Sequence, residues 1–108
     1  MATAGPATRK TVVIHVDAKG AVESTEPKVF EISKSNQEEV IWRVDSKQAV
    51  YFTVEFKGAS PFYESQFSTD FPVSGLVRRS VLADPLKKYE YTVRAGGKTL
   101  DPGGVVHH

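Results

Sequence analysis

Alternation of apolar and polar residues with a period of two constrains the fold of this chain more than any other feature. Four segments carry this alternation: Thr11–Asp17, Glu39–Asp45, Val50–Phe56 and Tyr89–Arg94. Successive side chains of a β-strand point to opposite faces, so each segment predicts a strand with one buried and one solvated face. Trp42 is the only tryptophan, and we expect it in the core because it shares the inward register of its segment.

Weaker alternation predicts further strands at Lys28–Ser33, Val77–Leu82 and Leu100–Val106. Turn-forming residues separate the segments, and no window shows a sustained helical period. Short strands at this spacing are typical of an all-β fold, and we expect a Greek-key β-sandwich of about seven strands. Residues 1–9 are predicted to form a flexible N-terminal tail, and residues 10–108 a single β-sandwich domain.

Charge and composition exclude several functions. The 108 residues carry a net charge of +1, which gives no long-range field to hold a phosphate backbone, so we expect no nucleic-acid partner. The chain has no cysteine, and this excludes disulfides and thiolate chemistry. The apolar runs are too short for a membrane span. The first residues lack the apolar stretch of a signal peptide, so the expected location is cytoplasmic, or periplasmic or extracellular if a signal was trimmed.

Two stretches resemble the cupredoxin family. Val40–Phe52 is similar to a strand pair in which an aromatic residue is followed, after a short polar turn, by a copper-binding histidine. Tyr89–Val106 is similar to the closing segment of that family, with an aromatic-x-aromatic-x-Cys strand, a loop that carries His and Met, and paired valines near its end. The resemblance implies a cupredoxin-like sandwich.

The ligands that the resemblance implies are missing. At the positions of the first histidine, the cysteine, the second histidine and the methionine, the chain has Ala49 or Val50, Val93, Gly96, and Lys98 or Thr99. A type 1 copper site needs a thiolate and two imidazoles around the metal. The resemblance therefore implies a scaffold without type 1 copper, and we expect no cofactor.

The long segment Lys57–Gly75 interrupts the strand pattern. Long ordered loops are often functional, and this one carries four aromatic residues: Phe62, Tyr63, Phe67 and Phe71. Either the rings cap one end of the fold, or one or two stay exposed and contact a partner. The leading hypothesis is a non-catalytic binding module that uses these four residues to bind a protein or a second copy of itself.

Three alternatives remain. The first is a metal-handling, copper-binding protein with His15, His107 and His108 as non-standard ligands, although solvent-exposed histidines explain the same pattern. The second is an enzyme or a small-ligand carrier. Neither a nucleophile elbow nor a carboxylate pair in a pocket is evident, so we expect no enzyme. The third is a docking face formed by outward-pointing Ile41 and Tyr51.

Overall fold

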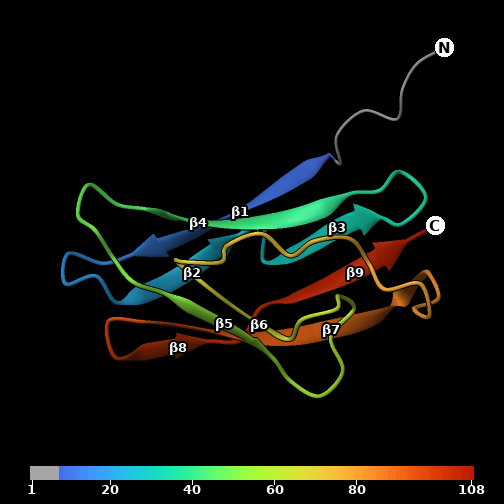
Figure 1. Ribbon diagram of the computed structural model, residues 1–108. Coiled ribbons are helices and arrows are strands. Elements are labelled where there is room, and N and C mark those ends of the chain that lie inside the picture. Colours follow the sequence, from blue (N-terminus) through green and yellow to red (C-terminus); the bar gives the residue numbers. More distant parts are fainter. Residues whose placement is uncertain (1–7) are drawn as a thin grey trace, which may run out of the picture.

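The computed structural model describes residues 8–108, and Figure 1 shows that this part of the chain is built from strands. Its nine strands are β1 (Arg9–Val16), β2 (Val22–Glu26), β3 (Val29–Ser33), β4 (Glu39–Asp45), β5 (Thr53–Phe56), β6 (Gln66–Ser68), β7 (Asp84–Ala95), β8 (Lys98–Leu100) and β9 (Gly103–His107). The all-β prediction is confirmed for these residues. Within residues 8–108 we find no helix with the length and apolar character needed to cross a membrane.

The strands form two curled sheets. The smaller sheet has the order β2-β1-β4, with β1 antiparallel to β2 and parallel to β4. The larger sheet has the order β3-β9-β7-β5-β6, and β8 also pairs with β7. In it, β3 and β9 run parallel, whereas the other neighbours are antiparallel. Figure 1 shows β1 and β4 above and β7 and β8 below.

The core lies where aromatic rings of the two sheets meet. Trp42 of β4 packs edge-on against Phe30 of β3 and Tyr91 of β7, with ring centroids 6.4 and 5.6 Å apart. The prediction that Trp42 is buried is confirmed, since it is 1% exposed. Large rings remove much apolar area from water, and edge-to-face pairs add a favourable quadrupole term. Trp42 of the smaller sheet thus packs among rings of the larger sheet, and aliphatic side chains such as Val12 and Ile14 complete the core.

The strands predicted from clear alternation are present, with some shifted ends. β1 and β4 lie at the predicted segments, and Tyr89–Arg94 is the central part of the longer β7. The fourth segment begins later than predicted, since β5 starts at Thr53 and not at Val50. The amide of Phe52 donates to the hydroxyl of Thr69, so a side chain occupies the donor that a strand partner would use.

Of the three weaker predictions, Lys28–Ser33 is confirmed as β3, whereas the other two were less accurate. Val77–Leu82 is not a strand, because its backbone turns between Arg78 and Val81 and the Lys34 ammonium donates to two of its carbonyls. Leu100–Val106 is divided into β8 and β9 by Pro102, which has no amide hydrogen to donate. The sequence prediction missed β2 and β6, so the number of strands is nine and not about seven.

The predicted N-terminal tail, residues 1–9, falls mainly on residues 1–7, which lie outside the described residues. Its last residue, Arg9, is the first residue of β1. The carbonyl of Thr8 accepts a hydrogen bond from the amide of Glu39 at 2.9 Å, and the Arg9 guanidinium donates to the Glu39 carboxylate. Arg9 thus belongs to β1, which begins one residue before the predicted boundary at residue 10.

Candidate functional site

The four aromatic residues of Lys57–Gly75 are divided between core and surface. Phe62 and Phe67 are only 1% and 5% exposed, and their ring centroids lie 6.2 Å apart. The Phe67 ring also stacks on Trp42 at 5.0 Å. These two rings hold the segment from inside and leave little of their surface for a partner to contact. The predicted contact surface is therefore reduced to the other two rings.

Tyr63 and Phe71 are exposed, at 67% and 74%, but they have different surroundings. The Tyr63 hydroxyl accepts a long hydrogen bond, 3.4 Å, from the backbone amide of Arg79. Phe71 instead exchanges two backbone hydrogen bonds with Ser68 across a tight turn. Phe71 borders an open groove, whereas Tyr63 is not among the residues that line it.

The groove has a volume of about 710 Å³ and lies along β5 and β6. Phe71 and Tyr51 contribute exposed rings to it, and Tyr51 is 59% exposed. Two hydrogen bonds between Phe52 and Thr69 bring the rings together: the Thr69 amide donates to the Phe52 carbonyl, and the Phe52 amide donates to the Thr69 hydroxyl. Residues 20 positions apart in sequence thus share one groove.

Polar side chains line part of the rest of the groove, and three of them are paired. The Gln66 amide donates to Glu55 at 2.9 Å, and the Arg94 guanidinium lies 4.0 Å from the other oxygen of the same carboxylate. Thr53 lies opposite Arg94 in the pairing of β5 with β7. The groove therefore combines exposed aromatic side chains with polar groups of both charges, and aromatic residues and Arg are enriched in protein interfaces.

One wall of the groove, residues 71–74, is fixed to the edge of β4. The Trp42 amide donates to the Pro72 carbonyl at 2.9 Å. Ser74 makes two bonds with Val40: its hydroxyl accepts from the Val40 amide at 2.8 Å, and its amide donates to the Val40 carbonyl at 2.7 Å. A wall held by backbone hydrogen bonds needs little ordering when a ligand binds.

The three histidines of the alternative metal site do not converge. His15 of β1 lies opposite Asp45 at the end of β4, with ring nitrogens 3.4 Å from Glu26 and 3.6 Å from Asp45. His107 lies opposite Ser33, and a short turn connects Ser33 to the start of β4. The length of β4, roughly 20 Å for six residue steps, separates His15 from the other two histidines.

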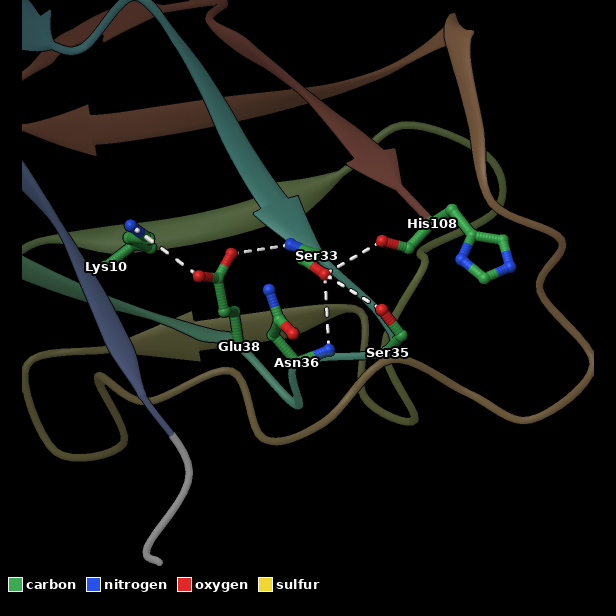
Figure 2. Close-up of polar contacts among 6 residues, drawn as sticks. All are labelled: Lys10, Ser33, Ser35, Asn36, Glu38 and His108. Carbon is green, nitrogen blue, oxygen red and sulfur yellow. Dashed lines mark hydrogen bonds and ion pairs between the residues drawn. The ribbon is translucent and has the colours of Figure 1, made fainter.

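Figure 2 shows how the chain is held at the His108 end. The Ser33 hydroxyl donates to the His108 backbone carbonyl at 2.9 Å, and the Ser33 amide donates to the Glu38 carboxylate at 2.6 Å. The other oxygen of that carboxylate pairs with Lys10. The His108 imidazole points away from these residues. Across residues 8–108, no group of three or more His, Asp or Glu side chains could hold a metal ion.

Two of the positions that correspond to copper ligands in the resemblance, Val50 and Gly96, both lie beside Gly20. A Cβ added to Gly20 would lie 3.4 Å from the Val50 side chain, and a Cβ added to Gly96 would lie 2.5 Å from the Gly20 carbonyl oxygen. Gly96 has a φ of 60° at the tip of the β7–β8 hairpin, where glycine avoids strain. Val93 is fully buried in β7. None of these side chains can bind a metal.

Two carboxylates of the fold are held ionised by their neighbours. The Thr92 hydroxyl donates to Asp101 at 2.8 Å, and this bond, followed by the nearby Lys57 ammonium, lowers the pKa of Asp101. The backbone amides of Ala21 and Lys19 lower the pKa of Asp17 in the same way. Such carboxylates link turns to strands and do not suit general acid chemistry at neutral pH.

Two polar atoms are buried in the aromatic core without a hydrogen-bond partner among residues 8–108. They are the Tyr91 hydroxyl and the Trp42 indole nitrogen. Burial raises the pKa of Tyr91 to about 12, while the nearby Trp42 indole opposes the shift. The phenol therefore stays neutral at physiological pH, and it is enclosed by rings instead of facing the groove.

The sequence prediction missed the groove, although it placed Tyr51 at an outward position. It grouped Tyr51 with Ile41, but Ile41 lies in β4 of the smaller sheet, whereas Tyr51 precedes β5 of the larger sheet. Ile41 is half-buried beside Val73. The one signal for the groove in the sequence was a pair of rings, Tyr51 and Phe71, that do not occupy inward positions of a predicted strand.

Comparisons with protein-family models, with curated proteins and with solved structures find no match for this chain.

Proposed function

We propose that this chain is a non-catalytic binding module that holds a protein partner in the groove bordered by Tyr51 and Phe71. One observation carries the proposal: two exposed aromatic rings border the same groove, and beside them Gln66 and Arg94 are both paired with Glu55. Exposed aromatic anchors with a polar surround are enriched among residues that dominate binding energy. The groove is open instead of enclosed, which suits a protein segment better than a small ligand.

For the fold, we propose a Greek-key sandwich of cupredoxin-like type without the copper site. Two sheets that meet through one aromatic core support this assignment. The approach of Val50 and Gly96 at Gly20 also supports it, because the resemblance assigns copper ligands to both positions. Val50, Gly96 and buried Val93 offer neither a thiolate nor an imidazole, so the same assignment favours binding over electron transfer.

The test is affinity capture from an extract of the source cell, followed by titration of the captured protein. We expect Tyr51→Ser combined with Phe71→Ser to weaken binding by roughly 30-fold or more, which corresponds to the loss of one strong anchor. Tyr63→Ser is the matched control, because Tyr63 is equally exposed but lies outside the groove. Unchanged affinity in the double variant, with the fold intact, would exclude the groove.

Phe62 and Phe67 are unsuitable for this experiment. Serine at either position would leave a cavity and a buried hydroxyl in the core, so lost binding would report unfolding. Loss of binding in the groove variants must therefore be accompanied by an unchanged unfolding midpoint. That pairing of measurements separates a contact residue from a residue that only stabilises the fold.

A further inference from the structure

A second surface lies on the segment from Arg78 to Lys88, which we call the basic leucine segment. Leu82 is 82% exposed and Leu86 is 93% exposed, the two highest values among the large apolar side chains of residues 8–108. Beside Leu82, Val81 is buried and Ala83 packs against the core. In an extended chain neighbouring side chains point to opposite sides, so the inward anchoring of Val81 and Ala83 turns Leu82 outward.

Hydrogen bonds fix the first half of this segment. The Arg78 guanidinium donates twice to the Ser60 carbonyl, at 3.1 and 2.7 Å. The Lys34 ammonium donates to the carbonyls of Arg79 and Val81. These contacts join the segment to the turn after β3 and to the chain before Phe62. The exposure of Leu82 is thus imposed by the fold.

Leu86 lies in a large β-bulge of β7. From Asp84 to Tyr89, β7 advances five residues, while the paired strand β9 advances only two, from Val106 to Gly104. The extra residues must leave the ladder, and the Leu86 amide is held by the Asp84 carboxylate at 2.9 Å. In Figure 1 the start of β7 lies beside the C-terminal end of β9. None of the residues that line the groove belongs to Arg78–Lys88. The basic leucine segment and the groove are therefore separate surfaces.

Charge is concentrated on the same segment. It contains four basic residues and one acidic residue, Asp84, a net charge of +3, so the other residues of the chain together carry −2. Arg79, Lys87 and Lys88 are exposed, and the Lys87 ammonium lies 5.0 Å from the centre of the Tyr89 ring. Two protruding leucines are thus flanked by cations on a chain whose remainder is slightly acidic.

We infer that the basic leucine segment docks on an anionic phospholipid surface. In the bound state Leu82 and Leu86 enter the boundary between headgroups and acyl chains, while Arg79, Lys87 and Lys88 face the lipid phosphates. Apolar side chains flanked by Lys and Arg fit that boundary, and each cation near an anionic leaflet strengthens binding. Leucine is under-represented among the anchors of protein interfaces, which favours lipid over an acidic protein surface.

The test is co-sedimentation of the full chain with vesicles of phosphatidylcholine, with and without phosphatidylserine. We expect binding only to vesicles that contain phosphatidylserine, and weaker binding as salt is raised. Leu82→Ser combined with Leu86→Ser should weaken it by roughly tenfold or more. Arg79→Gln combined with Lys87→Gln should weaken it by roughly 30-fold. Leu76→Ser is the control, because Leu76 is also exposed but lies outside the segment.

Three results would overturn the inference. The first is no binding of the unaltered chain to phosphatidylserine vesicles at low salt. The second is equal binding by the double leucine variant, which would mean that the cations act alone. The third is binding of polyglutamate that requires both leucines while vesicles are not bound, which would identify an acidic protein surface as the occupant. Thermal unfolding of each variant checks that the fold is intact.

Discussion

The core rings Phe62 and Phe67 and the surface rings Tyr63 and Phe71 lie in one segment of the chain and have opposite environments. The first two pack among the rings of both sheets, where Phe67 stacks on Trp42. The other two leave most of their area in water, although the backbone around them is held by hydrogen bonds. Within this one segment, some rings therefore stabilise the fold from the core, whereas others are exposed and available for contact. Aromatic content alone does not identify a contact surface.

The largest expected effect is the difference in stability between a core-ring variant and a surface-ring variant of this segment. Phe67→Ala should lower the free energy of unfolding by about 3–5 kcal/mol, because it removes a buried ring and leaves a cavity. Phe71→Ala should change it by no more than about 0.5 kcal/mol, as expected for a surface side chain. Urea unfolding followed by Trp42 fluorescence measures both. Equal losses in the two variants would contradict the division between core and surface rings.

The second prediction concerns stability at alkaline pH, where the hydroxyl of the core ring Tyr91 titrates. The folded pKa of Tyr91 is about 12, above its ordinary value of 10.0. The unfolded chain therefore loses this proton first, and stability should fall as pH rises from 10 to 12, by up to roughly 3 kcal/mol. Urea unfolding across this range measures the slope. Tyr91→Phe should reduce the slope, and an unchanged slope would assign it to other groups.

At neutral pH, we expect Tyr91→Phe to have a smaller effect on stability. Most core substitutions lower stability, but this one should not. The Tyr91 hydroxyl is buried without a hydrogen-bond partner, so removing it relieves a desolvation cost. We expect Tyr91→Phe to leave stability unchanged or to raise it by about 1 kcal/mol, while Phe67→Ala lowers it. A clear loss of stability, measured by thermal unfolding, would mean that the hydroxyl has a partner in solution.

The smallest expected effect on stability concerns the hydrogen bond between Asp101 and Thr92 of β7. The folded pKa of Asp101 is lowered, so its contribution is present above the ordinary value of 3.8 and is lost as pH falls through the folded value. Asp101→Asn should lower the urea midpoint slightly at pH 7 and weaken the acid dependence. The matched comparison is Asp70→Asn, because Asp70 is also an exposed aspartate. Equal pH profiles for the two variants would contradict this role of Asp101.

The sequence carried the information for the strands that bury one face. Alternation around Trp42 and Tyr91 predicted β4 and the centre of β7 because every second residue there meets the core. It could not predict β6, which has three residues and is defined by its pairing with β5. β2 was missed because only Val22 and Thr25 of its five residues are buried, three positions apart. That spacing is not the strand period.

The candidate site was predictable only in part, for a different physical reason. Lys57–Gly75 has no regular period, so no register tells Phe67 from Phe71 in the sequence. The groove depends on contacts between distant residues, such as the Thr69 hydroxyl on the Phe52 amide. Leu82 was hidden because Val77–Leu82 was interpreted as a strand, whereas Lys34, 45 or more residues earlier, binds its carbonyls. Such tertiary contacts leave no local pattern.

The most direct test of the central claim is amide chemical-shift mapping of the isotope-labelled chain during titration with the captured protein partner. We expect the largest shifts around Tyr51, at Gln66–Phe71 and at Arg94, with small shifts at Tyr63 and at the buried Phe62. The opposite result, in which the largest shifts lie at Tyr63 or on the outer face of β1 and the groove residues do not respond, would contradict the claim that the groove is the binding surface.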